Sequence, residues 1–273
     1  MSAGSTGPDA PVGVFDSGIG GLTVVRALRA RLPRESIVYF GDTARVPYGT
    51  KSAETITRFA LQDAEFLAAR GVKLVVVACH SASSVALPEL VRRVGVPVVG
   101  VIDPGARALV AATRSRRVAV IGTRATIASG AYERAIRAAD PEVEIVAKPT
   151  PLLVPLAEEG WQDGEVAELV VRRYLAGLAD EGVDALLLGC THFPLLADAI
   201  GRVLGPGVKL VDSSEETAAR AATLLDEQGL LDRAGTPRHR CYLSDLTPSF
   251  EQVGARFLGA PLGEVMRASV AGG

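Results

Sequence analysis

Short apolar runs alternate along the chain with longer stretches in which apolar residues recur at helical spacing. Glycine, proline and aspartate separate the two kinds of stretch. This alternation is typical of strands and helices that build a parallel, doubly wound sheet. The predicted strands are 12–15, 37–40, 74–78, 97–102, 117–121, 143–147, 185–188, 209–211 and 240–243. The predicted helices are 22–32, 53–70, 82–93, 126–139, 165–181, 194–203, 215–227 and 248–258.

The pattern restarts at residue 117. Each half consists of a strand, a helix, a strand, a long helix, a glycine, a strand and then a cysteine, which is Cys79 in the first half and Cys190 in the second. We interpret this order as an internal duplication. It predicts an α/β fold of two similar doubly wound lobes with parallel sheets, related by a pseudo-twofold axis, with the active site in the cleft between them.

The duplication also predicts the domain boundaries. We expect the first lobe to comprise residues 12–98 together with 211–273, and the second lobe to comprise residues 99–210. Residues 1–11 are small, polar and rich in Pro and Gly, so we expect a disordered tail there. They lack the charged and apolar regions of a secretory signal, which favours a cytoplasmic protein with reduced thiols.

The composition excludes several classes of protein. Apolar residues make up 48% of the 273 residues, enough for a large core, and the net charge is −2. There is no extended basic cluster that would indicate a nucleic-acid partner. No apolar run approaches the ~18 residues that a membrane span needs. The three histidines do not show the spacing of metal ligands, so we predict no metal site.

Both cysteines follow a predicted strand and precede a predicted helix. They should therefore lie at the carboxyl edge of a parallel sheet, where such folds bind their ligands. The N-terminus of a helix stabilises a thiolate, which predicts a lowered thiol pKa. A lone cysteine is most often a small core residue, and we interpret Cys241 in that way. Cys79 and Cys190, at matching places in duplicated halves, instead favour chemistry between two thiols.

Two turns come at the same predicted edge. Turn 16–21 offers backbone N–H groups to a carboxylate, and Asp16 can accept from an ammonium group or a histidine. A simple helix cap is the alternative for this turn. Thr23 stands where a dinucleotide-binding motif has its last glycine, so that motif is not matched. Turn 47–50 is either an ordinary turn or one that closes over a small ligand.

Several short segments, spread in order over residues 12–228, match the motifs of one family. They are 13–23, 41–49, 78–79 with 81–82, 120–123 with 126, 155–160, 188–194 and 211–213. In this combination the chain resembles the cofactor-independent glutamate racemases of bacterial cell-wall synthesis. The resemblance implies interconversion of L- and D-glutamate by two-base, two-thiol transfer of the α-proton, without a cofactor. The D-glutamate would supply peptidoglycan.

The resemblance also implies roles for individual residues. Cys79 and Cys190 would be the acid/base pair, with Asp16 and His192 as their auxiliaries, and the first cysteine would act on the D enantiomer. The residues implied to hold the substrate are Asp16, Ser17, Tyr48, Gly49, His80, Ser81, Thr123, Thr191 and His192. Additional candidates are Pro47, Thr126 and Glu158. The glutamate racemase family suggests a homodimer, and we expect no nucleic-acid or membrane partner.

One position departs from the family pattern. The residues after the first cysteine are usually Asn-Thr, whereas this chain has His80 and Ser81. Serine keeps the hydroxyl of threonine. Histidine keeps a donor and an acceptor but adds bulk and a group that titrates near neutral pH.

Three other functions remain alternatives at this point. A racemase of the same group could act on aspartate, a hydantoin or another acidic substrate. A two-lobed protein could bind a small molecule without catalysis, although exported receptors of that type carry a signal sequence. A thiol redox protein usually has the spacing Cys-x-x-Cys, which neither Cys79 nor Cys190 shows.

Overall fold

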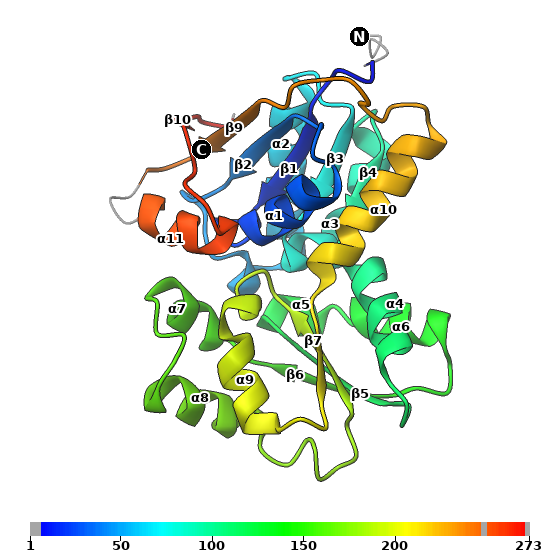
Figure 1. Ribbon diagram of the computed structural model, residues 1–273, viewed down its shortest axis with the longest axis vertical. Coiled ribbons are helices and arrows are strands. Elements are labelled where there is room, and N and C mark those ends of the chain that lie inside the picture. Colours follow the sequence, from blue (N-terminus) through cyan, green and yellow to red (C-terminus); the bar gives the residue numbers. More distant parts are fainter. Residues whose placement is uncertain (1–6, 247–249, 271–273) are drawn as a thin grey trace.

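The computed structural model of the chain describes residues 7–246 and 250–270. It has two lobes, one above the other in Figure 1, and each lobe packs helices around a parallel sheet. The first sheet, in the order β10-β9-β2-β1-β3-β4, contains β1 (Val12–Asp16), β2 (Ile37–Gly41), β3 (Leu74–Val77), β4 (Val98–Gly100), β9 (His239–Leu243) and β10 (Val265–Arg267). The second sheet, in the order β6-β5-β7-β8, contains β5 (Arg117–Gly122), β6 (Glu144–Pro149), β7 (Ala185–Gly189) and β8 (Lys209–Val211).

The two sheets share one topology. The order β2-β1-β3-β4 in the first sheet corresponds strand for strand to β6-β5-β7-β8 in the second. The described pairs in both sheets are parallel. In this order the chain reverses direction across the sheet between β1 and β3, and again between β5 and β7. Ligands of open α/β sheets bind at such switch points, just beyond the carboxyl ends of the strands.

The helices connect and cover these strands. They are α1 (Leu22–Arg31), α2 (Ala53–Ala68), α3 (His80–Arg93), α4 (Ile102–Ala112), α5 (Arg124–Ala128), α6 (Ala131–Ala139), α7 (Leu153–Glu158), α8 (Glu165–Leu175), α9 (Ala197–Leu204), α10 (Ser213–Glu227) and α11 (Phe250–Leu258), with the 3₁₀ turns η1 (Tyr48–Thr50) and η2 (Phe193–Leu196). The central strands β1, β3 and β7 are buried along their whole length. Helices therefore cover both faces of the sheet, which explains why these strands are continuous apolar runs without alternation.

The chain crosses between the lobes twice. It leaves the first sheet after β4 through α4, and it returns from β8 through α10 to β9 (Figure 1). Helix α4 packs against α6 and α10, and α10 packs in turn against α1. The last strands, β9 and β10, thus extend the first sheet beyond β2. We retain 12–98 with 211–273, and 99–210, as proposed domains; the first sheet includes β4, which ends at Gly100.

The predicted helix boundaries differ from the structure in several places. Helix α4 was not predicted; its Pro104 lies in the first turn, where proline is tolerated. The predicted helix 126–139 is two helices, α5 and α6, separated at Gly130 with a φ of 63°. Helix α8 ends at Leu175, well before residue 181. Helix α7 and strand β10 are also additional to the prediction.

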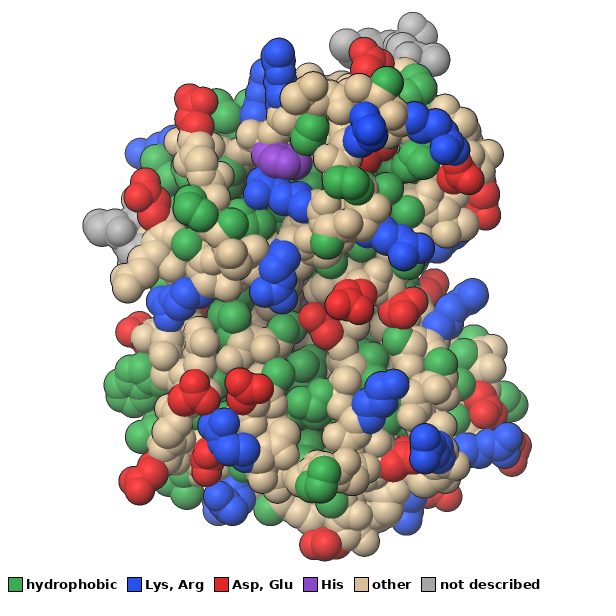
Figure 2. Space-filling model, in the orientation of Figure 1, with side chains coloured by type: hydrophobic (Ala, Val, Ile, Leu, Met, Phe, Trp, Pro, Cys, Tyr) green, Lys and Arg blue, Asp and Glu red, His purple; other side chains and the backbone are tan. Residues whose placement is uncertain are grey.

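The N-terminal residues and the charged surface are the remaining features of the fold. Of the expected tail 1–11, residues 1–6 lie outside the described residues; residues 7–11 form a turn whose Pro8 carbonyl accepts from the ammonium group of Lys73. Figure 2 shows basic and acidic side chains interspersed on one face rather than gathered in a single field. Within residues 7–246 and 250–270, no helix has the length and apolar character required to cross a membrane.

Candidate active site

A cavity of about 290 Å³ lies where the switch points of the two sheets face each other. The predicted site residues that line it are Asp16, Ser17, Pro47, Tyr48, Gly49, Cys79, His80, Ser81, Thr123, Glu158, Cys190, Thr191 and His192. Thr126 is the exception, because it is fully buried behind the lining. The fold therefore brings together residues from four loops, which follow β1, β2, β3 and β5, with those of α7 and the loop after β7.

Cys79 lies at the N-terminus of α3 in the first lobe. It is 4% exposed, its sulfur accepts from the N–H of Ala82 at 3.5 Å, and its thiol donates to the hydroxyl of Ser17 at 3.5 Å. Burial and the nearby carboxylate of Asp16 raise the pKa of the Cys79 thiol to about 12. The prediction of a lowered pKa is therefore wrong for this cysteine, because burial outweighs the helix N-terminus.

Asp16 ends β1 beside this thiol. Its Oδ2 accepts from the backbone N–H groups of Gly18 and Gly21, at 3.3 and 3.0 Å. Burial raises the pKa of Asp16, although the charge of His192 and these N–H groups oppose the effect. Gly21 allows the close approach, since a Cβ at this position would lie 2.5 Å from Cβ of Asp16. The glycine-rich turn thus holds a buried carboxyl group at the edge of the cavity.

The second cysteine has different partners. Sγ of Cys190 lies 3.7 Å from Nδ1 of His192, and Nε2 of the same ring lies 3.1 Å from Oε1 of Glu158. Burial alone would lower the pKa of His192, but the hydrogen bonds with Cys190 and Glu158 raise it to about 10. The ring packs edge-on against Phe257, with the ring centroids 5.1 Å apart. At neutral pH His192 is therefore an imidazolium, which stabilises negative charge on the neighbouring sulfur.

Hydroxyl groups join the two lobes across the cavity. Oγ of Ser81, in α3, lies 2.9 Å from Oγ1 of Thr123, which caps α5 in the second lobe. Thr126 completes the cluster, with its hydroxyl 3.0 Å from that of Thr123 and 3.3 Å from that of Ser81. These hydroxyls and the first N–H groups of α3 and α5 form a concentration of donors suited to a carboxylate.

Tyr48 lines the cavity with its ring and backbone, whereas its hydroxyl group is engaged elsewhere. The phenol lies within hydrogen-bonding distance of Asp42 and Asp63, and Arg45 bonds both of those carboxyl groups. Burial, followed by the charge of Asp42, raises the pKa of Asp63 well above its usual range. This network holds the turn that carries Tyr48 and Gly49 against the cavity.

Six residues that line the cavity were not predicted. They are Val46, Thr50, Arg124, Pro151, Val154 and Pro155. Arg124 is the charged member of this group and directly follows Thr123, so its place beside a predicted residue was the available signal. Val46 and Pro155 lie within the family motifs 41–49 and 155–160, and Thr50 lies within the turn 47–50, whereas Pro151 and Val154 have no distinguishing pattern in the sequence. Together they give the cavity a largely apolar wall around a few polar groups, as is usual for small-molecule sites.

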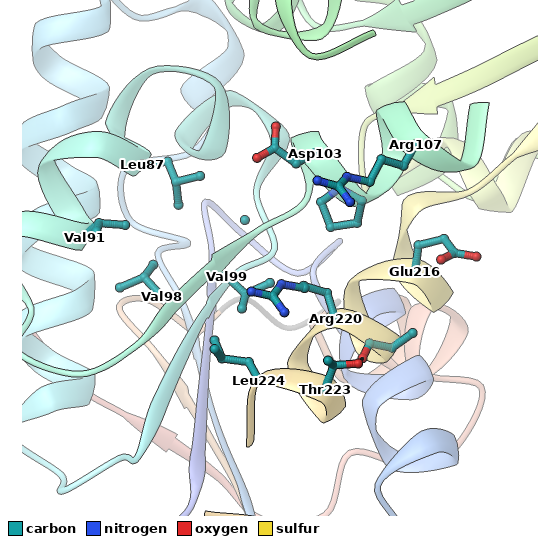
Figure 3. Close-up of a pocket in the computed structure, with 13 residues that line it drawn as sticks. Leu87, Val91, Val98, Val99, Asp103, Arg107, Glu216, Arg220, Thr223 and Leu224 are labelled. Carbon is teal, nitrogen blue, oxygen red and sulfur yellow. Dashed lines mark hydrogen bonds between the residues drawn. The ribbon is translucent and has the colours of Figure 1, made fainter. Parts of the chain in front are cut away.

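A second, larger cavity of about 730 Å³ lies at the crossovers between the lobes. Figure 3 shows Asp103 and Arg107 from α4 beside it, with Glu216 and Arg220 from α10. No predicted site residue lines this cavity. Over the described parts of the chain, no group of three or more His, Cys, Asp or Glu side chains is placed to hold a metal ion.

Known proteins resemble this chain in both sequence and structure. The family model described as Asp/Glu/Hydantoin racemase matches residues 22–221. The chain belongs to this racemase family. A glutamate racemase from Geobacter metallireducens is 55% identical over 260 residues, covering 95% of this chain and 96% of that protein. Members of the family with known structures share the two-lobed fold as well.

Three solved racemases illustrate the structural likeness. Glutamate racemase from Francisella tularensis, in complex with D-glutamate, has a TM-score of 0.92 and 40% sequence identity, covering 97% of this chain and 99% of that one. Glutamate racemase from Thermus thermophilus, in complex with β-chloro-D-alanine, has a TM-score of 0.87 and 50% identity, covering 97% and 98%. An aspartate racemase from Picrophilus torridus, at 19% identity and a TM-score of 0.55, shares the fold.

Proposed function

We propose that this chain is a glutamate racemase, which interconverts L- and D-glutamate by moving the α-proton between two thiols. The observation that carries the proposal is the convergence of Cys79 and Cys190 on one cavity from the ends of β3 and β7, in separate sheets. Membership of the racemase family and 55% identity to a glutamate racemase support the choice of reaction and substrate.

The reaction needs a base on one face of the α-carbon and an acid on the other. One sulfur, as thiolate, takes the α-proton, while the opposite thiol delivers its own proton to the other face. The product is the other enantiomer, and the two sulfurs have exchanged protonation states. Because Cys79 and Cys190 belong to different lobes, the two faces are served without moving either residue through the site.

The surroundings of the two sulfurs favour one starting state. Cys79 retains its proton, because burial and the carboxylate of Asp16 raise its pKa to about 12. Negative charge on Cys190 is stabilised by the imidazolium of His192 at 3.7 Å. Cys79 is thus suited to act as the acid of the first lobe. When Cys190 acts as the base, the family assignment of the first cysteine to the D form makes L-glutamate the substrate.

The main energetic obstacle is the weak acidity of the α-proton. Each unit of pKa difference between proton donor and acceptor costs ~1.4 kcal/mol. The site can narrow the gap by directing donors at the carboxylate on which charge develops, including the hydroxyls of Ser81, Thr123 and Thr191. Exclusion of water strengthens these interactions, and both thiols are shielded, with exposures of 4% for Cys79 and 7% for Cys190.

The biological setting follows from the proposed reaction. D-Glutamate supplied in this way would serve peptidoglycan synthesis, and a cytoplasmic location fits an enzyme that feeds precursor assembly. A homodimer remains the proposed assembly, which light scattering of the purified protein would test.

The decisive experiment is a racemisation assay with L- or D-glutamate and no added cofactor, in which the optical activity of the solution is monitored over time. We expect conversion from either enantiomer to a 1:1 mixture. L- and D-aspartate are assayed in parallel. Racemisation of aspartate with higher kcat/KM than glutamate would assign a different substrate, and no turnover of either would contradict the proposal.

A further inference from the structure

Two residues that line the cavity each have a buried polar atom without a hydrogen-bond partner. Among the described residues of the lining, these atoms are Oδ1 of Asp16 and Nδ1 of His80. An unpaired polar atom in a buried position is costly unless a ligand satisfies it. Both atoms therefore suggest contacts that the free protein leaves unmade.

His80 is held firmly at its other ring nitrogen. It is the first residue of α3, it is 3% exposed, and its Nε2 lies 3.1 Å from Oγ of Ser213. Burial, with the charge of His192, lowers the pKa of His80 to about 3. The ring is therefore neutral at physiological pH and carries one proton. The hydrogen bond with Ser213 decides which nitrogen holds it.

Ser213 is itself fixed in place. It opens α10 and is fully buried, and its carbonyl accepts from the hydroxyl of Thr217 at 2.7 Å. Gly105 of α4 makes room for it, because a Cβ at Gly105 would lie 3.0 Å from Cβ of Ser213. The serine hydroxyl thus reaches His80 from a tightly packed junction of α3, α4 and α10.

The charges around the cavity indicate what Nδ1 would meet. Asp16 offers an unpaired carboxylate oxygen, which suits the ammonium group of an amino acid. His80 instead lies at the N-terminus of α3 and near the positive His192, where an anion is favoured. A glutamate substrate brings two carboxylates that require donors. A proton on Nδ1 makes His80 such a donor.

We propose that Ser213 is a positioning residue: its hydroxyl donates to Nε2 of His80, so that the neutral ring carries its proton on Nδ1 and donates it to a carboxylate of the substrate. The inference rests on the proposed function for the identity of that substrate. It gives His80, the departure from the usual asparagine, a defined role, since Nδ2 of asparagine and Nδ1 of histidine are both bonded to Cγ and can both carry a proton.

The tautomer of His80 can be read in the free protein by ¹⁵N NMR. The chain has three histidines, so the His80→Asn variant identifies the signals that belong to His80. We expect the proton on Nδ1 in the wild type, and a mixture containing the Nε2–H tautomer in Ser213→Ala. A wild-type ring protonated on Nε2 would overturn the proposal, and this measurement does not depend on catalytic activity.

A double-mutant cycle tests the consequence for the substrate. Ser213→Ala should raise KM for both enantiomers of glutamate about fivefold, the size of one neutral hydrogen bond, with a smaller change in kcat. In the His80→Asn background, Ser213→Ala should leave KM unchanged, because the asparagine amide no longer depends on the serine. Ser214→Ala is the matched control, because the hydroxyl of Ser214 donates to Asp212 in the same turn of the helix. Equal effects of Ser213→Ala in both backgrounds would indicate a merely structural role.

Glutarate separates a contact to carboxylate from one to ammonium, because it has two carboxylates and no ammonium group. We expect glutarate to inhibit the wild type competitively, and His80→Leu to weaken this binding about tenfold, as for a hydrogen bond to a charged group. Unchanged glutarate binding in His80→Leu would overturn the assignment. Failure of the proposed function itself would be seen separately, as wild-type protein that does not racemise glutamate.

Discussion

The two halves of the active site place equivalent cysteines in opposite electrostatic surroundings. Cys79 and Cys190 both follow the third strand of a lobe, at corresponding switch points. A buried carboxyl group, Asp16, stands near the first, and an imidazolium, His192, contacts the second. The shared topology of the two lobes thus places a carboxyl group beside one thiol and an imidazolium beside the other.

The largest effect should come from removing either sulfur. Cys79→Ser and Cys190→Ser should each reduce racemisation ~10³-fold or more, because general acid–base groups contribute on this scale. Each variant should still exchange the α-proton of one enantiomer with D₂O, since one thiol remains to remove and return it on a single face. The enantiomer that exchanges should differ between the two variants, as NMR in D₂O will show.

One outcome would contradict proton transfer by one thiol on each face of the α-carbon. Exchange of both enantiomers by Cys79→Ser, together with racemisation near the wild-type rate, would mean that another group replaces the thiol. Cys241→Ser is the control for general thiol loss, because Cys241 is buried in β9 away from the cavity.

The next largest effect concerns the imidazolium beside Cys190. His192→Asn should lower kcat/KM ~100-fold, as expected for loss of a charged auxiliary. The reduction must be equal in both directions, because the equilibrium constant between enantiomers is 1. Any difference between the halves of the site can therefore appear only in kcat and KM separately. Initial-rate kinetics from each enantiomer will show whether it does.

The raised pKa of His192 also predicts how the stability of the protein depends on pH. Its pKa is raised from 6.5 to about 10 on folding. Its contribution to stability is therefore complete below pH 6.5 and is lost as the pH rises through 10. The melting temperature of the wild type should fall as the pH rises through this window. The melting temperature of His192→Asn should change less with pH. Identical profiles for the two proteins would contradict a charged His192.

The first lobe holds its side of the site through the network under Tyr48. Arg45 pairs with both Asp42 and Asp63, and burial raises the pKa of Asp63, so that Asp63 is the carboxyl group expected to take up a proton first. Asp42→Asn should cost about 3 kcal/mol of unfolding free energy, because it leaves Arg45 only the carboxyl group that holds its charge less readily. Asp63→Asn should cost under about 1 kcal/mol, since an amide resembles the protonated acid expected there. Urea denaturation will rank the two, and a reversed order would contradict this assignment of the proton.

The smallest effect is expected on the second lobe, at Glu158. Its side chain is 40% exposed, so its charge is partly screened by solvent. Glu158→Gln should reduce kcat/KM only a few-fold, and it should lower the pKa of His192, which would move the alkaline limb of the pH profile to lower pH. Glu159→Gln, at an exposed neighbour outside the cavity lining, is the matched control.

Much of this site could be predicted from local pattern, and its electrostatics could not. The strands that end just before Cys79 and Cys190 are visible in the sequence as apolar runs bounded by turn residues. The family motifs then identified the other predicted site residues. The pKa of Cys79 depends on burial and on Asp16, which is distant along the chain. The engagement of the Tyr48 hydroxyl likewise depends on α2 packing behind it, and only the assembled fold contains that information.

The shielding of both sulfurs has a kinetic consequence. After each turnover the free enzyme is left in one of two forms, according to which sulfur bears the proton, and the product just released determines the form. With exposures of 4% and 7%, water has poor access to reset Cys79 and Cys190. We therefore expect saturating substrate to outrun this reset. In an equilibrium mixture with one enantiomer isotopically labelled, the label should transiently overshoot its even distribution, which is the signature of an enzyme that retains a record of its last product.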